Sequence, residues 1–187
     1  MKLTKSKRNN FFFLIVIALL IIPQTRQPIQ IVLHKGLALF GPSIVAEDER
    51  KAVTNYNWEL KDLNGDTFNL NEIEGKVVLI NFWATWCPPC IAEMPSLQKL
   101  HDDYKDRISI LFVSNEEREA IQRFLDKKDY NFNVYQPISN VPETLKSRSI
   151  PRTFLLDKKG NIVIDKSGAA DWNSEKVRRQ IDALLPQ

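Results

Sequence analysis

Cys87 and Cys90 are the only cysteines of the chain, and they stand three positions apart in the run Trp86-Cys87-Pro88-Pro89-Cys90. An apolar, strand-like run over 77–83 precedes them, and apolar residues at helical spacing follow. Because positions i and i+3 lie on one face of a helix, two thiols at this spacing can close into a disulfide and open again. The pair therefore predicts reversible thiol–disulfide chemistry.

The two thiols are expected to play different parts. A thiolate attacks a disulfide, and the amides and dipole at a helix N-terminus favour negative charge, so Cys87 is the predicted nucleophile and Cys90 the resolving thiol. Pro88 and Pro89 have no backbone N–H, which leaves the amide of Cys90 as the main donor to a Cys87 thiolate. Weaker stabilisation of the thiolate predicts a pKa that is less depressed and a pair that acts as a reductant.

Other uses of the pair are less favoured by the sequence. A static disulfide enclosing two residues would constrain the unfolded chain little. Zinc sites use about four ligands, whereas the two histidines, His34 and His101, lie far from the pair in the sequence. We therefore expect no metal and no cofactor, and a copper carrier that binds Cu(I) through the two thiolates remains the alternative function.

The pattern of the remaining chain predicts an α/β fold. Strands alternate with helices and are followed by a hairpin and a last helix, which indicates a mixed central sheet covered by helices on both faces, with an N-terminal hairpin before it. The expected strands are 57–63, 67–70, 77–83, 108–114, 133–135, 153–157 and 161–165, and the expected helices are 88–106, 116–128, 142–147 and 173–185.

The N-terminus carries the pattern of an export signal. A basic stretch, 1–10, is followed by the unbroken apolar run 11–22, as in a secretory signal or a short membrane anchor. Small residues at the spacing of a cleavage site are missing near Ile22, so we favour an uncleaved anchor over a removed signal peptide. The basic residues should stay in the cytoplasm, and the rest of the chain should face outward.

These features divide the chain into three parts. Residues 1–28 form a cytoplasmic stub and membrane anchor or signal, residues 29–53 a stalk or interfacial segment with a linker, and residues 54–187 the globular domain. Residues 1–46 hold six Lys or Arg and no acid, so the remainder has 26 − 6 = 20 basic against 23 acidic residues. Such a faintly acidic domain lacks the basic surface of a nucleic-acid-binding protein, whereas the N-terminal segment suits contact with membrane lipid.

Residues 82–90 resemble the active site of thioredoxin-fold proteins, most closely the membrane-anchored thiol–disulfide oxidoreductases of the TlpA and ResA kind. The resemblance covers residues 54–185, and Ile150-Pro151-Arg152-Thr153 is similar to the loop that faces the cysteine pair in that family. It implies a thioredoxin fold, a cis peptide bond before Pro151, and a backbone at Ile150 that pairs with an extended substrate. Trp86 and Pro88 join these residues as expected substrate contacts.

The resemblance also assigns a role to Glu93. Cytosolic thioredoxins carry a buried acid where this chain has Asn81, and the ResA-like branch places a carboxylate three residues after the second cysteine, here Glu93. On a helix, that spacing keeps Glu93 on the side of Cys90, where it could take the Cys90 proton. The alternative is a solvated glutamate near the helix N-terminus. Trp83 is expected in the core, and Trp58 and Trp172 have no assignable role.

The function implied by the resemblance is the reduction of disulfides in exported proteins, often in cytochrome c maturation. The expected place is the inner membrane of a bacterium, with one N-terminal anchor and the domain on the periplasmic or outer face. A membrane electron-donor protein would re-reduce the pair, because reduction outside the cytoplasm needs a source of electrons. A peroxidase of related fold is disfavoured, because Thr85 lies only two residues before Cys87 and no Thr-x-x-Cys pattern occurs.

Overall fold

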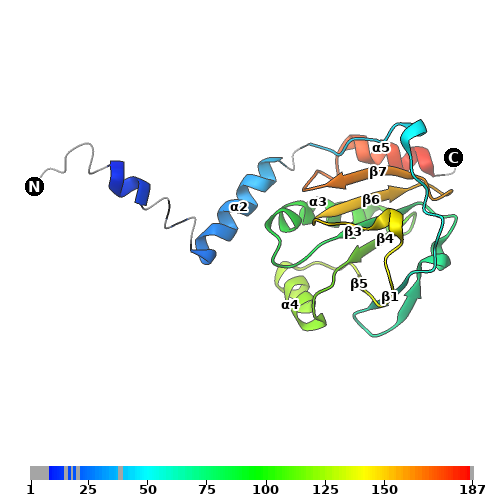
Figure 1. Cartoon of the computed structure of the whole chain (residues 1–187), viewed down its shortest axis with the longest axis horizontal. Coiled ribbons are helices and arrows are strands. Elements are labelled where there is room, and N and C mark those ends of the chain that lie inside the picture. The colour runs from blue at the N-terminus through cyan, green and yellow to red at the C-terminus, as the bar shows by residue number, and fades with distance from the viewer. Residues whose placement is uncertain (1–8, 15–16, 18, 20–21, 38–39, 186–187) are drawn as a thin grey trace, which may run out of the picture.

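A computed structural model describes residues 9–14, 17, 19, 22–37 and 40–185 of the chain. Within these residues seven strands form one mixed sheet in the order β2-β1-β5-β4-β3-β6-β7 (Figure 1). The predicted α/β class, with a mixed sheet and an N-terminal β1–β2 hairpin, is confirmed. The strands are β1 Glu59–Asp62, β2 Thr67–Asn69, β3 Val78–Phe82, β4 Ser109–Val113, β5 Val134–Pro137, β6 Arg152–Leu156 and β7 Ile162–Ser167.

The centre of the sheet is parallel and its two sides are antiparallel. Strands β3, β4 and β5 run parallel, whereas β6 pairs antiparallel with β3 and β7 with β6. Successive side chains of β3 point to opposite faces, so Leu79 joins one apolar cluster while Val78 and Ile80 join the other. Burial on both faces explains why this segment is apolar without interruption.

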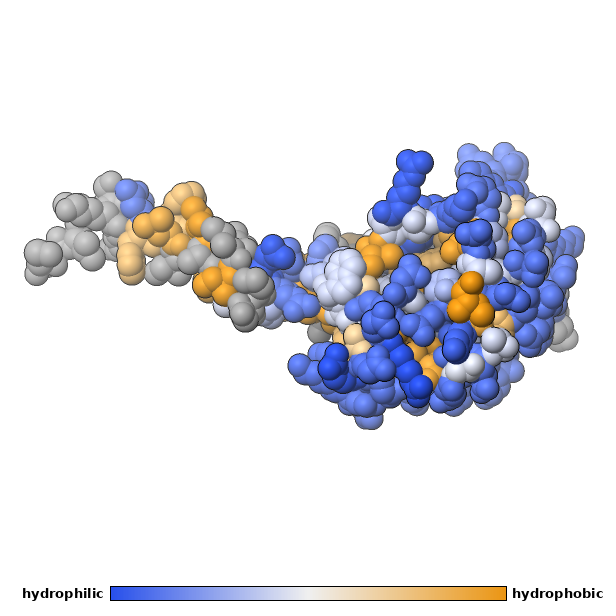
Figure 2. All heavy atoms as spheres, turned by 60° about the horizontal axis from the view of Figure 1, so that its bottom comes forward, coloured by the Kyte–Doolittle hydropathy of each residue, from blue (hydrophilic) through white to orange (hydrophobic). Residues whose placement is uncertain are grey.

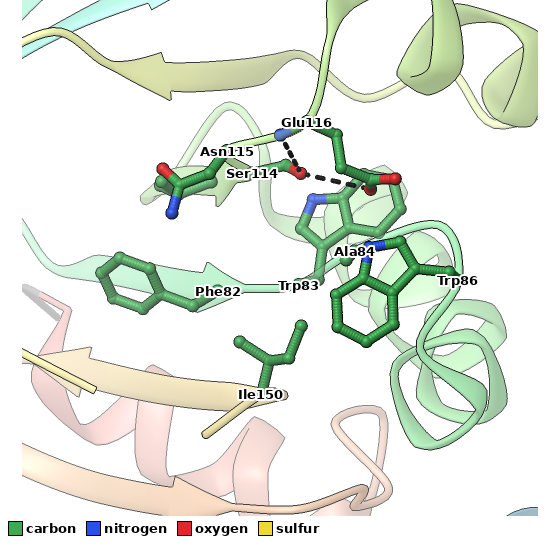
Figure 3. Close-up of a pocket in the computed structure, with 9 residues that line it drawn as sticks. Phe82, Trp83, Ala84, Trp86, Ser114, Asn115, Glu116 and Ile150 are labelled. Atoms are coloured by element: carbon green, nitrogen blue, oxygen red, sulfur yellow. Dashed lines mark hydrogen bonds between the residues drawn. The ribbon is translucent and has the colours of Figure 1, made fainter. Parts of the chain in front are cut away.

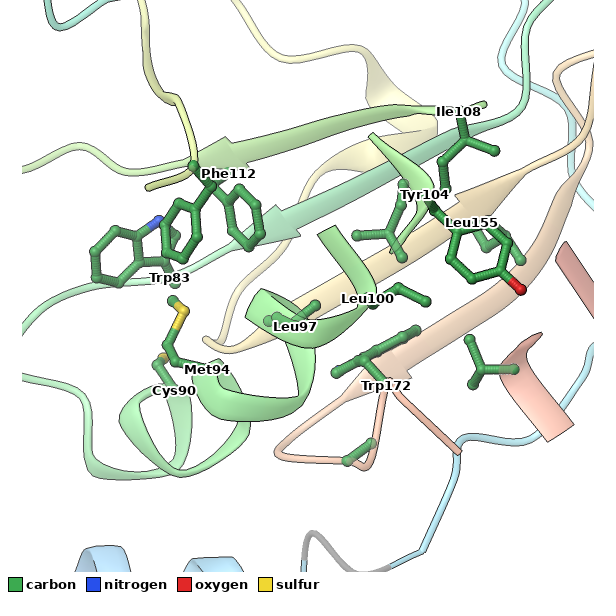
Figure 4. Close-up of a cluster of buried hydrophobic side chains, with 14 of the residues drawn as sticks. Trp83, Cys90, Met94, Leu97, Leu100, Tyr104, Ile108, Phe112, Leu155 and Trp172 are labelled. Carbon is green, nitrogen blue, oxygen red and sulfur yellow. The ribbon is translucent and has the colours of Figure 1, made fainter. Parts of the chain in front are cut away.

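The first cluster receives apolar side chains from three α-helices, which are α3 Pro88–Tyr104, α4 Arg118–Lys128 and α5 Glu175–Leu184. The second cluster lies against the other face of the sheet, where short 3-10 helices at Leu70–Ile73 and Glu143–Leu145 contribute buried leucines. Figure 4 shows Trp172 beside the leucines of α3, so the loop before α5 also belongs to the first cluster.

The N-terminal segment carries much exposed apolar surface. Helix α2, Pro23–Leu37, lies beside α3, and Figure 2 shows apolar residues gathered along the N-terminal segment, whereas the visible face of the domain is mainly hydrophilic. Among the described residues, no helix has both the length and the apolar character needed to cross a membrane. The predicted anchor, 11–22, includes positions 15–16, 18 and 20–21, which lie outside the described residues.

Residues 40–53, which we call the strap, run along the outer edge of β7. Val45 N–H donates to the carbonyl of Val163 at 2.9 Å, and Ile162 N–H donates to the carbonyl of Lys51 at 2.8 Å. The strap thus satisfies backbone groups that an edge strand would otherwise expose. It ends where Val53 N–H donates to the carbonyl of Gly160.

The contact between the strap and the β6–β7 turn predicts a costly substitution, Gly160→Ala. Gly160 has φ +79°, and a methyl group there would lie 3.0 Å from the Val53 carbonyl oxygen and would clash with the Tyr56 hydroxyl. Gly75 is a matched control, because it has φ +80° and nothing within 4 Å of an added methyl. Left-handed backbone costs about 1–2 kcal/mol for alanine at either site, and crowding should add about 1–3 kcal/mol at Gly160 alone. Urea unfolding of both variants measures the difference, and equal losses would show that the strap contact is loose.

Candidate active site

The cysteine pair lies at the start of α3, directly after the turn that follows β3. Cys87 is the N-cap residue of the helix, and Cys87 and Cys90 are joined by a disulfide with Cα atoms 5.2 Å apart. Cys87 is 3% exposed and Cys90 is fully buried. Strand β3 determines this position. It ends at Phe82, and Trp83 N–H still donates a hydrogen bond to the carbonyl of Val113, at the end of the neighbouring strand β4.

The two prolines between the cysteines suit the first turn of the helix. Proline is tolerated at these positions because the first N–H groups of a helix have no partner within it. Since Pro88 and Pro89 have no N–H, the backbone donor to the Cys87 sulfur is Cys90 N–H, at 3.3 Å. The Cys90 amide is thus in place to donate to a Cys87 thiolate, and the dependence of the thiolate on this donor stays a prediction.

Glu93 lies one helical turn beyond Cys90 and is 1% exposed. Its Oε1 accepts a hydrogen bond from Asn81 Nδ2 at 2.9 Å. Its Oε2 accepts from Trp172 Nε1 at 3.0 Å and from the backbone N–H of Ala170 at 3.2 Å. The alternative that Glu93 is a solvated surface residue is therefore wrong.

Burial makes Glu93 a weak acid for its type. Desolvation raises the pKa of this carboxyl group from 4.5 to about 7, although the hydrogen bonds from Trp172, Asn81 and Ala170 and the charge of Lys166 each lower it. A carboxyl group with this pKa changes its protonation state near neutral pH. It can therefore hold or release a proton under conditions in which thiols are also active.

The surroundings of Glu93 are drawn from distant parts of the chain. Asn81 on β3 also donates to Thr153 Oγ1 on β6 at 2.7 Å, and both residues are fully or nearly fully buried. Trp172 is 79 positions from Glu93 in the sequence. Sequence reasoning missed Trp172 and Ala170 as neighbours of Glu93, because spacing along one helix indicates which face a residue occupies but does not identify what packs on that face.

A pocket of about 290 Å³ opens at Trp86, the residue before Cys87, and neither cysteine lines it (Figure 3). Trp86, which is 64% exposed, and Ile150 both line this pocket. The predicted contacts Pro88 and Pro151 do not line it, although the Ile150–Pro151 peptide bond is cis, as the resemblance implies. The other lining residues come from the end of β3 and the segment after β4, and they are Phe82, Trp83, Ala84, Val113, Ser114, Asn115 and Glu116.

Glu116 is another residue of this site that sequence reasoning missed. Its carboxylate accepts hydrogen bonds from both the backbone N–H and the hydroxyl of Thr85, the latter at 2.7 Å. Thr85 lies two residues before Cys87, so Glu116 ties the turn that carries Trp86 to the segment after β4. Trp83 is 2% exposed and packs in the core, as predicted.

Metal binding by side chains requires clustered ligands. Across 9–14, 17, 19, 22–37 and 40–185, no group of three or more His, Cys, Asp or Glu residues is arranged to hold an ion. The two sulfur atoms are bonded to each other, so a two-thiolate copper site would require the reduced pair, and that alternative stays a prediction.

Comparison with known proteins defines the class to which this arrangement belongs. Residues 52–164 match the model of the AhpC/TSA family. The thioredoxin domain of a thiol-disulfide oxidoreductase of Bacteroides vulgatus superposes with a TM-score of 0.59, at 22% identity over 73% of this chain and 99% of that one, which shows the thioredoxin-like fold. The chain therefore belongs to the AhpC/TSA family and has a thioredoxin fold.

Relatives with higher sequence identity to this chain show to which branch of the family it belongs. The thiol-disulfide oxidoreductase ResA of Halalkalibacterium halodurans is 41% identical over 134 residues, which cover 70% of this chain and 75% of that protein. The ResA protein of Oceanobacillus iheyensis is 31% identical over 187 residues, covering 98% of this chain and 93% of that protein. This chain is a member of the ResA/TlpA type and an enzyme of thiol–disulfide exchange, which confirms the resemblance found in the sequence.

The raised pKa of Glu93 predicts a pH dependence of stability in the disulfide form. The unfolded chain releases this proton near 4.5 and the folded chain near 7, so the folded state binds more protons between these values. The contribution of Glu93 to the free energy of unfolding is therefore fully present below pH 4.5 and is lost as pH rises through about 7.

Glu93→Gln should remove this dependence. Relative to the variant, wild type should lose about 3 kcal/mol between these limits, from about 1.4 kcal/mol for each pKa unit. Urea unfolding of the oxidised wild type and variant at several pH values measures the difference. A constant difference from acid to neutral pH would contradict the raised pKa.

Proposed function

We propose that this thiol–disulfide oxidoreductase works as a membrane-tethered reductant of disulfides in exported proteins. The observation that carries the proposal is a buried carboxyl group, Glu93, one turn after a disulfide at the N-terminus of α3. Pro88 and Pro89 support the direction of the reaction, because they leave the Cys87 sulfur with the Cys90 amide as its backbone donor and so limit stabilisation of the thiolate.

The proposed reaction starts from the reduced pair. The Cys87 thiolate attacks one sulfur of the substrate disulfide, which breaks that bond, forms a mixed disulfide and releases the first substrate sulfur as a thiolate. Cys90 then attacks the Cys87 sulfur, closes the Cys87–Cys90 disulfide and releases the second substrate sulfur. Two electrons pass from the pair to the substrate, which ends as a dithiol.

Glu93 takes part in the second step of this reaction. Cys90 must lose its proton before it attacks, because the thiolate is the nucleophile. The ionised Glu93 carboxylate accepts that proton and later returns it to solvent or to a departing substrate sulfur. A pKa of about 7, raised by burial, suits a group that must both take and give a proton near neutral pH.

Substrate contacts are assigned to the exposed rim of the pair. Trp86 offers an exposed ring at the pocket, and the side chain of Ile150 lies near that ring, across the pocket from Ser114 (Figure 3). The backbone of Ile150, before cis Pro151, pairs with an extended substrate segment in the manner of an added strand. Pro88 completes the contact surface next to Cys87.

The location and partners follow from the N-terminal pattern. Residues 1–10 are basic and 11–22 are apolar, which supports an anchor in the inner membrane and a domain on the periplasmic or outer face. Reduction there requires a membrane protein that donates electrons, and tethering raises the effective concentration of the domain near that donor. The N-terminal segment makes the contact with membrane lipid. The substrates implied by the resemblance include apoproteins in cytochrome c maturation.

The substitution Cys90→Ser tests this mechanism. The full-length variant keeps Cys87 but lacks the thiol that resolves the mixed disulfide, so it should retain substrates covalently and lose insulin-reducing activity by at least about 100-fold. Non-reducing electrophoresis of cells that express the variant detects the trapped adducts, and a turbidity assay measures the insulin reduction.

Cys87→Ser provides the matched control. It should abolish activity and trap no partner, because the attacking thiol is gone. Equal trapping by the two variants, or full activity of Cys90→Ser, would contradict the assigned order of the two cysteines.

A further inference from the structure

Trp172 lies in the loop between β7 and α5 and is fully buried. Its ring packs beside Leu97 and Leu100 of α3 (Figure 4), and its indole N–H donates to Glu93 Oε2 at 3.0 Å. Another large aromatic ring, such as that of phenylalanine, could occupy this part of the core, but it could not supply a donor to a buried carboxyl group. The position of the N–H therefore needs an explanation beyond packing.

The loop that carries Trp172 is held against α3 by its own backbone. Trp172 N–H donates to the hydroxyl of Ser96 at 3.2 Å, and that hydroxyl donates to the backbone carbonyl of Glu93 at 2.7 Å. From the other side, Asp171 N–H donates to the carbonyl of Phe40 at the start of the strap, at 3.1 Å. The indole thus meets the carboxyl group from a backbone fixed at two neighbouring residues.

The two oxygens of Glu93 differ in what they receive. Oε1 is bonded by Asn81, a residue of the central strand β3, whereas Oε2 is bonded by Trp172 and Ala170 from one loop. Lys166 on β7 is the charged group whose field acts on Glu93, and it favours the ionised form. The loop is therefore the part of the protein that supplies two of the three donors to this carboxyl group.

We propose that Trp172 is a positioning residue for Glu93, and that its indole N–H sets how readily this carboxyl group accepts the proton of Cys90. The inference rests on the role given to Glu93 in the proposed function and extends it to a residue that touches no sulfur and no substrate. A hydrogen bond to the ionised form stabilises that form, so loss of the indole N–H makes the carboxylate harder to form.

The variant Trp172→Phe removes the donor and keeps an aromatic ring. In a single turnover of the reduced full-length wild type with insulin, the rate at which Cys90 resolves the mixed disulfide, measured separately from the rate of its formation, should rise with pH as Glu93 ionises. In Trp172→Phe, the midpoint of that rise should move upward by about one pH unit, because a hydrogen bond to a charged group is worth about one to two pKa units. The substitution Trp172→Phe in a Glu93→Gln background should cause no further change in the pH profile of the rate.

Trp58→Phe is the matched control. Trp58 is also fully buried, it lies in the other apolar cluster, and among the described residues its indole N–H has no hydrogen-bond partner. Its replacement should lower stability through lost packing but leave the midpoint of the pH profile unchanged. A shift caused by general loosening of the core would appear in both variants.

The hydrogen bond between Trp172 and Glu93 can also be tested without an activity assay. In the oxidised wild type, the indole N–H resonance of Trp172 should move with pH around the pKa of Glu93, about 7, while that of Trp58 stays constant. In Glu93→Gln the Trp172 resonance should no longer titrate. Nuclear magnetic resonance of ¹⁵N-tryptophan-labelled protein resolves these signals among the four tryptophans of the chain.

The results separate the two claims. If Glu93→Gln removes the rise of the resolution rate near pH 7 while Trp172→Phe leaves the midpoint of that rise in place, the role of Trp172 is overturned and that of Glu93 stands. If Glu93→Gln leaves the profile intact, the proton step of the proposed function fails, and the role of Trp172 fails with it. An indole resonance of Trp172 that ignores pH in wild type would also overturn the inference.

Discussion

The burial of one carboxyl group connects the chemistry of this protein to its fold. Removing Glu93 from water disfavours its charged form, and the cost is offset only when donors reach both oxygens. Those donors come from a strand in the centre of the sheet, through Asn81, and from the loop before α5, through Ala170 and Trp172. The pKa of the group is therefore a property of the assembled domain, because no single element supplies its surroundings.

Cys87, at the N-terminus of the helix α3 that carries Glu93, has fewer polar contacts than Glu93. Cys87 receives one backbone N–H, from Cys90, because the two intervening residues are prolines. Glu93, one turn beyond Cys90, receives three donors. The first two turns of α3 thus place a lightly stabilised sulfur near a firmly held carboxyl group, which suits a pair that gives electrons away and needs a nearby site for its proton.

Local patterns in the sequence were enough to predict the elements that carry the site. The continuous apolar run over 77–83 indicated a strand, and the helical spacing after Cys90 indicated α3. The spacing of Glu93 indicated its side of the helix but left open whether water or protein lay there. The structure decides this, because the residues that cover Glu93 are separated from it by long stretches of chain.

Other features left no readable signal in the sequence. The hydrogen bonds of Thr85 with Glu116 join two turns 31 positions apart, and both residue types are common in exposed loops. Only scattered backbone hydrogen bonds join the strap to β7, and no regular strand forms over 40–53, so the alternation of side chains that predicts a strand is not expected there. Such contacts depend on tertiary arrangement and become visible only when the sheet edge and the loops are placed together.

The central claim is that the protonation of Glu93 is coupled to the opening and closing of the Cys87–Cys90 disulfide. The most direct test is the reduction potential of the pair, measured in thiol–disulfide buffers across pH values from about 5 to 9, which include both the raised pKa of Glu93, about 7, and the reference pKa of a cysteine thiol, about 8.5. We predict that the slope of potential against pH differs between wild type and Glu93→Gln around neutral pH. Two parallel lines over the whole range would contradict the account, because the proton of Glu93 would then be indifferent to the state of the sulfur atoms.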